Sequence, residues 1–245
     1  MLAVTALGAV ESKEDAESAR TVARLLQVAH RVMALDSLKI PGFAENTPLR
    51  CYLCRQQLYA ALERIRLESE FEAVLDGAIA DDAQDYRPGL RAAKEAGVLH
   101  PLAEAGFSKD EVRIASRYLG LPTSDRPASP CLASRFPYGE AITLEALQTV
   151  ARAESLLHDW GFPIVRVRHH GRLARIEVPV GEVPRLCEEP LRSQVNAALS
   201  ALGYIYVCAD LLGFRSGSLN EVLESRSPQT VHLRLAHARR PDDSG

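Results

Sequence analysis

Alternating β-prone and helical segments are the feature that most restricts how the first half of this chain can fold. Short β-prone runs predict strands, and apolar residues three or four positions apart predict the helices between them. The predicted strands are 2–7, 30–35 and 71–75, and the predicted helices are 11–28, 50–69 and 108–118. Because strands and helices alternate, the pattern predicts a parallel α/β sheet, in which ligands bind outside the carboxyl ends of the strands.

The pattern changes after about residue 125. A loop rich in Pro and Ser leads to a predicted helix, a hairpin of two strands, a second helix and a last strand. The ranges are 144–160 for the first helix, 164–168 and 174–178 for the hairpin, 183–202 for the second helix and 204–208 for the strand. We therefore expect a parallel-sheet domain over 1–125, a smaller α+β domain over 126–222, and a flexible polar tail over 223–245. The α+β domain is expected to be ferredoxin-like, with one of its strands supplied by another part of the protein.

Charge and hydropathy argue against two classes of protein. The net charge of −3 gives no overall basic field, so a nucleic-acid binder is not expected. No run of about 18 apolar residues occurs, so we expect no membrane-spanning helix. The first residues lack the basic start of a signal peptide, and the five cysteines are unevenly spaced. These features predict reduced thiols in a cytoplasmic protein.

Cys51 and Cys54 are three residues apart at the start of a predicted helix, so both sulfurs lie on one helix face. The helix N-terminus and the adjacent Arg50 and Arg55 are expected to favour the thiolate form of these cysteines. This CxxC pattern fits half of a zinc site, a redox pair, half of an iron–sulfur site, or two buried small side chains.

Cys131 lies in a predicted loop, PCLASRFPYG, where a scaffold often positions functional residues. Zinc would need a fourth ligand beside Cys51, Cys54 and Cys131, whereas three cysteines alone fit a 4Fe-4S cluster with one iron left open. Cys187 and Cys208 fall on a predicted helix face and inside a predicted strand, so we interpret them as packing residues.

Charged residues form two further candidate sites. Arg166 and Arg168 are two apart on a predicted strand and face the same side, where they can bind a substrate phosphate or carboxylate, although a solvated strand face would look the same. Arg135, four residues after Cys131, can neutralise substrate charge beside the sulfur. A polar cluster past a strand end fits nucleotide or metal contacts, or a solvated loop; its members are Asp81, Asp82, Asp85, Tyr86 and Arg87.

Several motifs in the same order resemble the LarE family of sacrificial sulfur transferases, over roughly residues 1–222. The motifs are RCYLC at 50–54, LDG at 75–77, ADDAQDYRPG at 80–89, PCLASRFPYG at 130–139, VRVRHH at 165–170, RIEVP at 175–179 and LLGFRSG at 211–217. The resemblance implies a PP-loop ATP pyrophosphatase with a Rossmann-like (HUP) parallel sheet, and an enzyme that works on the nickel-pincer nucleotide cofactor of lactate racemase.

The resemblance also implies the chemistry. ATP with Mg²⁺ adenylates a carboxylate of pyridinium-3,5-biscarboxylic acid mononucleotide, and sulfur then displaces AMP. Family members with cysteines at the positions of Cys51, Cys54 and Cys131 resemble the type that depends on a 4Fe-4S cluster, so the resemblance makes these three residues catalytic and metal-binding. It places Glu154 and Glu177 near the substrate, and it implies a homo-oligomer.

The family begins with a strand that carries an SGGxDS loop, which cradles the ATP phosphates. The sequence has no such motif and begins at what matches the second family strand. We therefore expect a sheet without its first strand, and expect Met1 to be a false or truncated start.

Three other functions remain open. The first is a PP-loop enzyme that thiolates tRNA, which the absence of excess basic charge and the VRVRHH and RIEVP motifs disfavour. The second is a non-catalytic homologue that binds a cluster or oligomerises, which the missing phosphate loop suggests. The third is an α/β domain with a structural zinc.

Overall fold

The computed structural model describes residues 1–84, 88–127, 129–215 and 217–224. Residues Met1–Phe214 form one compact unit. The described part of the second unit, which begins at Arg215, contains a 3-10 helix, η5 (Ser218–Asn220), and the short helix α9 (Glu221–Glu224). Most of the predicted tail, 225–245, lies outside the described residues.

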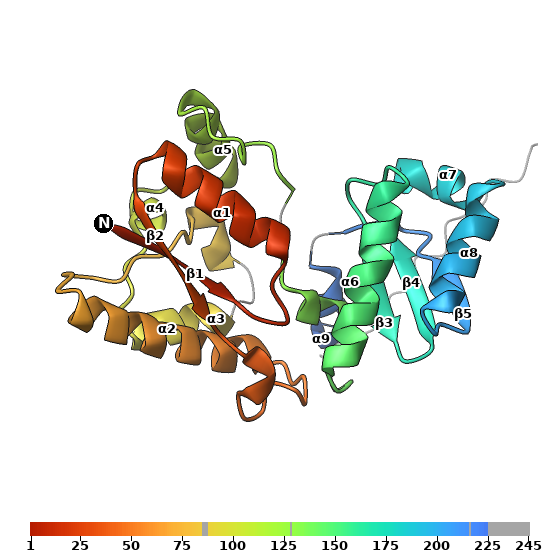
Figure 1. Ribbon diagram of the computed structural model, residues 1–245, viewed down its shortest axis with the longest axis horizontal. Helices are drawn as coiled ribbons and strands as arrows, with labels where there is room; N and C mark the ends of the chain where they lie inside the picture. The colour runs from red at the N-terminus through yellow and green to blue at the C-terminus, as the bar shows by residue number, and fades with distance from the viewer. Residues whose placement is uncertain (85–87, 128, 216, 225–245) are drawn as a thin grey trace, which may run out of the picture. The chain divides into compact units, whose positions relative to one another are not determined.

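The chain begins with the predicted strand–helix–strand unit. β1 (Leu2–Leu7) and β2 (Ala29–Ala34) pair in parallel, from Leu2 opposite Ala29 to Leu7 opposite Ala34. α1 (Lys13–Leu25) connects them and packs against both strands (Figure 1). Ser12 caps this helix by accepting a 3.0 Å hydrogen bond from the Asp15 amide. The prediction of parallel α/β structure is confirmed here.

The third predicted strand, 71–75, is wrong. Its pairing is reduced to a single parallel bridge between Leu75 and Leu99. The strand cannot continue because the next residue, Asp76, turns the chain by accepting a 3.0 Å hydrogen bond from the Ala78 amide. Leu75 and Leu99 remain 53% and 46% exposed, so little apolar burial holds the segment in place. The described parallel sheet therefore has two strands, and its Rossmann-like assignment stays a prediction.

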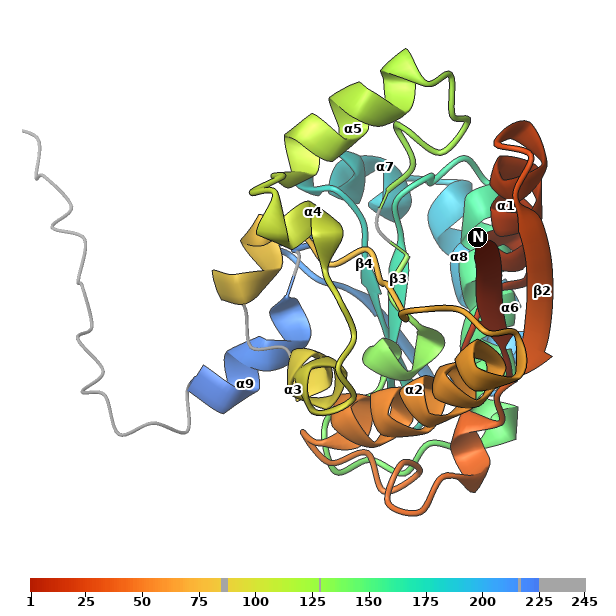
Figure 2. The same ribbon diagram turned by 90° about the vertical axis from the view of Figure 1, so that its left-hand side faces the viewer.

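Two of the next helices, α2 (Arg50–Glu68) and α5 (Lys109–Tyr118), are predicted by the sequence, whereas α3 (Pro88–Glu95) and α4 (Pro101–Glu104) are not. α2 packs against α3, as Figure 2 shows. α4 is a single turn. α5 begins at a capping box, in which Ser108 and Glu111 satisfy each other's backbone amides. Among the described residues, no helix is both long and apolar enough to cross a membrane.

The second sheet has the strand order β3-β4-β5. β3 (Arg166–His170) and β4 (Leu173–Glu177) form the predicted hairpin, with a turn of two residues, shorter than predicted, in which Gly171 has a φ of 58°. β5 (Tyr206–Ala209) pairs in parallel directly with β4. The ferredoxin-like expectation is wrong, because that fold requires another strand between these two.

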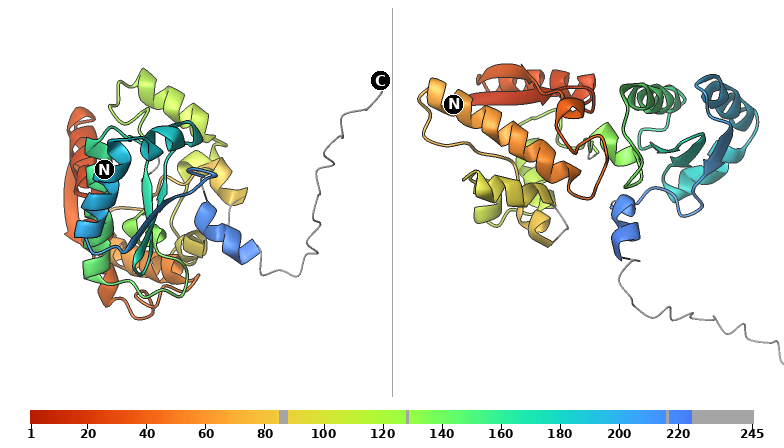
Figure 3. Two further views of the ribbon diagram at one scale, coloured as in Figure 1. Left: turned by 90° about the vertical axis from the view of Figure 1, so that its right-hand side faces the viewer. Right: turned by 90° about the horizontal axis from the view of Figure 1, so that it is seen from below.

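Helices cover one face of this second sheet. α6 (Leu144–Asp159) and α8 (Leu191–Ala201) lie on the same side of the strands (Figure 3, right). The single helix predicted over 183–202 is divided into α7 (Val183–Cys187) and α8. Pro190 explains the division, because it has no amide hydrogen and its ring disfavours a helix interior. The core between helices and sheet includes Leu157, Val167, Ile176 and Leu199.

A second apolar cluster joins residues from both sides of the predicted domain boundary at 125. Val10 and Phe43 come from the first part of the chain, whereas Ala133, Phe136 and Leu147 come from the second. All are at most 2% exposed. This cluster lies beside the loop that carries Cys131. The domain boundary itself stays a prediction.

Gly8 follows β1 at a close approach to the end of β2, so we predict that Gly8→Ala destabilises the fold. A Cβ at residue 8 would lie 2.1 Å from the carbonyl oxygen of Leu35, a distance that forces the backbone to shift. The free energy of unfolding is expected to fall by about 1–3 kcal/mol in urea titrations.

Gly77→Ala is the matched control, because no atom lies within 4 Å of a Cβ at that position. Its effect is expected to stay within about 0.5 kcal/mol. Equal losses of stability in the two variants would contradict the close packing of the strand ends.

Candidate functional site

Three cysteines lie around the apolar cluster that joins the two parts of the chain. Cys51 and Cys54 occupy the first turn of α2, where Cys51 is exposed and Cys54 is partly buried. Cys131 is the residue before the 3-10 helix η3 (Leu132–Arg135) and is also partly buried. Cys54 and Cys131 pack against the same cluster, so residues far apart in the sequence meet here.

Burial and neighbouring charged groups determine the pKa of the Cys131 thiol. Burial raises the pKa of the Cys131 thiol to about 11, and the nearby Cys51, Cys54 and Glu11 act in the same direction. The positive charge of Arg50 acts against this rise. Cys131 is therefore protonated at neutral pH. Because each of the other two thiols acts on Cys131, all three share one electrostatic environment.

The expectation that the helix start and its arginines make Cys54 a thiolate is wrong. Burial raises the pKa of Cys54 above its usual range, although Ser37 and Arg55 oppose the rise. The Ser37 hydroxyl oxygen lies 3.6 Å from the Cys54 sulfur. Desolvation of the charged form exceeds the stabilisation that a single exposed arginine provides.

Three thiols supply the donor atoms that an iron–sulfur cluster takes. The described residues nevertheless include no group of three Cys, His, Asp or Glu side chains placed to hold a metal ion. The donor chemistry fits a cluster, and what the described residues lack is a group arranged around a single ion. The 4Fe-4S cluster, and zinc as its alternative, therefore stay predictions.

Glu11 is a member of this region that the sequence did not reveal. It follows β1, and its Oε2 atom is buried without a hydrogen-bond partner among the described residues. Burial raises the pKa of this carboxyl, and the charge of Arg55 counteracts part of the rise. A lone glutamate at a strand end gives no sequence signal, because its neighbours Cys54 and Cys131 come from distant segments.

The guanidinium group of Arg135 forms hydrogen bonds with other groups of the protein. Its Nε and Nη2 atoms donate to both carboxylate oxygens of Glu154, at 2.9 and 2.8 Å, and its Nη1 atom donates to the carbonyl of Pro130 at 2.7 Å. Glu154 also accepts a 2.9 Å hydrogen bond from the Val167 amide. This bidentate pair is 3% and 6% exposed and ties the Cys131 loop to β3. A direct role of Arg135 with substrate stays a prediction.

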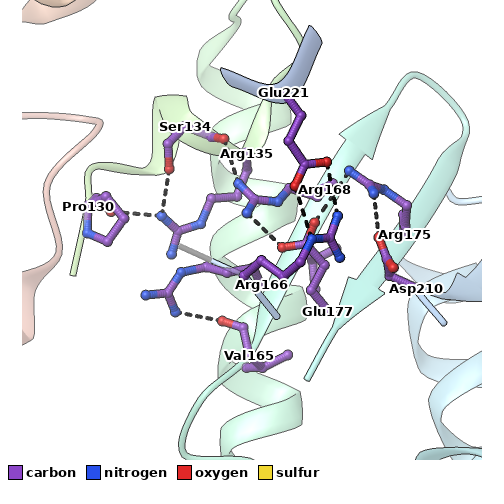
Figure 4. Close-up of polar contacts among 12 residues, drawn as sticks. Pro130, Ser134, Arg135, Val165, Arg166, Arg168, Arg175, Glu177, Asp210 and Glu221 are labelled. Atoms are coloured by element: carbon purple, nitrogen blue, oxygen red, sulfur yellow. Dashed lines mark hydrogen bonds and ion pairs between the residues drawn. The ribbon is translucent and has the colours of Figure 1, made fainter. Parts of the chain in front are cut away.

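Charged side chains line the sheet face opposite the helices. Arg166 pairs in register with Glu177, and Arg168 with Arg175, so these four side chains point the same way. Figure 4 shows their guanidinium and carboxylate groups gathered above β3 and β4. The prediction that Arg166 and Arg168 share a face is confirmed. The alternative of a solvated face is wrong, because Arg166 and Arg168 are 6% and 7% exposed.

Carboxylates hold this face together. Arg168 donates to Glu177 at 2.6 Å and to the Ser134 carbonyl at 2.8 Å. Arg175 lies 3.3 Å from the second oxygen of Glu177, which is fully buried. Burial, together with the positive charges of Arg135 and Arg168, lowers the pKa of Arg166 to about 10. Burial and neighbouring positive charge thus destabilise the charged form of Arg166.

The residues predicted to contact a nucleotide bind backbone amides of the protein where the structure describes them. Asp81 accepts a 2.9 Å hydrogen bond from the Lys109 amide at the start of α5, and Asp82 accepts one from the Ile79 amide at 3.1 Å. Both carboxylates thus bind backbone amides. Asp85, Tyr86 and Arg87 lie outside the described residues. Nucleotide binding by this group stays a prediction.

The interpretation of Cys187 and Cys208 as packing residues is wrong. Both are exposed. Cys187 ends the short helix α7, and Cys208 lies on β5, an edge strand of its sheet. Neither lies beside the three thiols described above.

Comparisons with known proteins show which proteins this chain is similar to. No protein-family model matches the chain. The chain is 42% identical over 222 residues to an uncharacterized protein of Synechocystis, covering 91% of this chain and 83% of that protein. It is 39% identical over 221 residues to the pyridinium-3,5-bisthiocarboxylic acid mononucleotide synthase of Lactiplantibacillus plantarum, covering 90% of this chain and 79% of that protein. An uncharacterized protein of Methanocaldococcus jannaschii is 28% identical over 182 residues.

The similarity to the synthase extends over most of both chains, and it includes the segments that carry the three cysteines and the arginine-lined sheet face. The chain therefore belongs to the LarE family, the pyridinium-3,5-bisthiocarboxylic acid mononucleotide synthases.

Proposed function

We propose that this protein transfers sulfur, in an ATP-dependent reaction, to the carboxylates of pyridinium-3,5-biscarboxylic acid mononucleotide during synthesis of the nickel-pincer nucleotide. The observation that carries the proposal is the shared environment of Cys51, Cys54 and Cys131. The relative from Lactiplantibacillus plantarum is named for the corresponding bisthiocarboxylic product. That name favours the mononucleotide over tRNA as the sulfur acceptor.

Adenylation explains why ATP is needed. A free carboxylate resists substitution, because its negative charge repels a sulfur nucleophile. Transfer of AMP from ATP to one carboxylate oxygen releases pyrophosphate and creates a leaving group. The sulfur nucleophile then forms a bond to the carboxyl carbon while the bond to the AMP oxygen breaks. AMP leaves with that oxygen and its electron pair, and a thiocarboxylate remains.

Cys131 is the proposed centre of the sulfur chemistry. It lies on the loop between the apolar cluster and β3, and Arg135 four residues later fixes that loop to Glu154. Because its pKa is about 11, the thiol needs a partner that removes or replaces its proton before it can act as a nucleophile or ligand. A 4Fe-4S cluster held by Cys51, Cys54 and Cys131 would supply sulfide for transfer.

The arginine-lined face is the proposed binding site for the anionic parts of the mononucleotide. Arg166 and Arg168 offer guanidinium groups that bind phosphate and carboxylate well. Burial, followed by repulsion from Arg135 and Arg168, lowers the pKa of Arg166, and a bound anion would offset the repulsion. Glu154 and Glu177 orient Arg135 and Arg168 in this proposal through the ion pairs at 2.8 and 2.6 Å.

The first prediction concerns Cys131→Ala, which we expect to reduce sulfur transfer to the uncatalysed level. Mass spectrometry of the mononucleotide after incubation with ATP measures replacement of oxygen by sulfur. Cys208→Ala is the matched control, since Cys208 is exposed on an edge strand. Full transfer by Cys131→Ala would refute the assigned role.

The second prediction concerns the metal. Protein purified without oxygen is expected to contain iron and acid-labile sulfide, and to lose both when Cys51, Cys54 or Cys131 is replaced by Ser. Stoichiometric zinc without sulfide would instead favour the structural-zinc alternative. Protein with neither metal would exclude a resident cluster.

The third prediction concerns proton release from Cys131 in the metal-free protein. Because only the thiolate reacts, the alkylation rate of Cys131 by iodoacetamide should still increase with pH above 9.5, towards the pKa of about 11. An ordinary cysteine, with a pKa of about 8.5, reaches its plateau by then. A plateau for Cys131 below pH 9 would contradict the burial of its thiol.

A further inference from the structure

Asn46 lies at the contact between the loop before α2 and the loop that carries Cys131. Its side chain is fully buried, although asparagine is usually exposed. Its backbone has a φ of 54°, in the left-handed region that asparagine tolerates better than most residues. A buried polar side chain in this conformation calls for an explanation, because the desolvation of its amide must be offset by hydrogen bonds.

The amide nitrogen of Asn46 supplies those bonds to the Cys131 loop. Nδ2 lies 2.7 Å from the carbonyl oxygen of Pro137, 3.0 Å from that of Glu140 and 3.3 Å from that of Phe136. In return, the Gly139 amide donates to the carbonyl of Asn46 at 2.9 Å. One residue therefore binds four backbone groups within five residues of the opposite loop.

The amide oxygen of Asn46 faces the helix that carries the other two cysteines. Arg50, the first residue of α2, donates from Nη1 to Asn46 Oδ1. Arg50 is 2% exposed, and its guanidinium carbon lies 5.3 Å from the centre of the Tyr138 ring. No carboxylate of the described residues forms an ion pair with it. The Asn46 amide and the Tyr138 ring are thus the neighbours that hold this buried cation.

Backbone hydrogen bonds fix the same loop on both sides of the Asn46 contact. The Leu132 amide, next to Cys131, donates to the carbonyl of Val10 at 2.8 Å. The Ile142 amide donates to the carbonyl of Ala44, also at 2.8 Å. The loop that carries Cys131 is therefore attached at one end to the segment after β1 and at the other end to the segment before α2.

We propose that Asn46 is a positioning residue: it sets where Cys131 lies relative to Cys51 and Cys54. Its Nδ2 atom holds the Cys131 loop, and its Oδ1 atom holds Arg50, which directly precedes Cys51. The consequence for catalysis rests on the proposed function, whereas the placement of the loop does not.

An asparagine meets both requirements at once. Its amide group donates to carbonyl oxygens and accepts from a guanidinium. An aspartate would still accept from Arg50, but it would place a negative charge beside three carbonyl oxygens. Asn46→Asp therefore separates the two functions of the side chain, because it keeps the contact to α2 and removes the contact to the loop.

The test compares Asn46→Gly with Glu70→Gly. Glycine tolerates a positive φ, so Asn46→Gly removes the side chain without straining the backbone. Glu70 has a φ of 56° and is exposed after the end of α2, so Glu70→Gly controls for the effect of glycine itself. The metal-free proteins are treated with iodoacetamide, and the rate at each cysteine is followed by mass spectrometry.

The expected result is an increase of roughly tenfold in the alkylation rate of Cys131 in Asn46→Gly, with unchanged rates at Cys187 and Cys208. Asn46→Asp should show the same increase, and Glu70→Gly none. A general loss of stability would instead raise the rate at every buried thiol, including Cys54, in proportion. An unchanged rate at Cys131, or a proportional rise at Cys131 and Cys54, overturns the proposal.

A second measurement needs no variant and keeps the proposal testable if Asn46→Gly does not fold. Amide hydrogen exchange of the native chain should be slow at Leu132, Gly139 and Ile142, which donate to the fixed partners. Exchange at these three amides as fast as in an open loop would overturn the proposal.

Sulfur transfer separates this proposal from the proposed function. If the wild-type protein transfers sulfur, Asn46→Gly should lower kcat at least about tenfold. The KM for the mononucleotide should stay unchanged, since Asn46 does not line the arginine face. An unchanged kcat despite a mobile Cys131 overturns the positioning role. If the wild type transfers no sulfur, the proposed function fails, and the alkylation result still decides the placement of the loop.

Discussion

Burial of the Cys131 loop between the end of β1 and the start of α2 is the constraint on which the rest of the site depends. The loop is held by the hydrogen bond from the Leu132 amide to the Val10 carbonyl and by the hydrogen bonds of Asn46. It packs with Phe43, Phe136 and Leu147. The same burial that brings Cys131 close to Cys51 and Cys54 raises its pKa to about 11. Proximity and low intrinsic reactivity thus have one physical cause, and sulfur chemistry at Cys131 requires a partner that stabilises the deprotonated sulfur.

Two buried ion pairs extend this constraint to the second sheet. Arg135 of η3 pairs with Glu154, which binds the Val167 amide of β3, and Arg168 pairs with Glu177 of β4 and donates to the Ser134 carbonyl of η3. Removing one partner of such a pair leaves an uncompensated buried charge and costs about 3–5 kcal/mol. The pairs therefore keep the Cys131 loop beside the arginine-lined face, so a substrate anion bound there would lie near the loop that carries the sulfur centre.

Local signals in the sequence predicted local structure well. Ser12, Ser108 and Thr143 cap α1, α5 and α6 close to the predicted helix starts, because a cap depends only on residues within one turn. Predictions failed where one residue opposed the surrounding pattern, as Asp76 did by turning the chain after Leu75 and Pro190 did by dividing a helix. The sequence revealed the arginine face because side chains two positions apart on any strand point to the same side of the sheet. Asn46 was missed because its partners lie about 90 residues away, and the pKa of Cys54 was misjudged because burial has no local signature.

The central claim is that Cys131 shares one site with Cys51 and Cys54 in the folded chain. Cross-linking with a short reagent that joins two thiols, such as dibromobimane, followed by peptide mass spectrometry, tests it most directly. We expect Cys131 to be joined to Cys51 or Cys54 and not to Cys187 or Cys208, and urea to remove this selectivity. Native protein in which the reagent joins Cys131 to neither cysteine of α2 would show that the three thiols do not share one site.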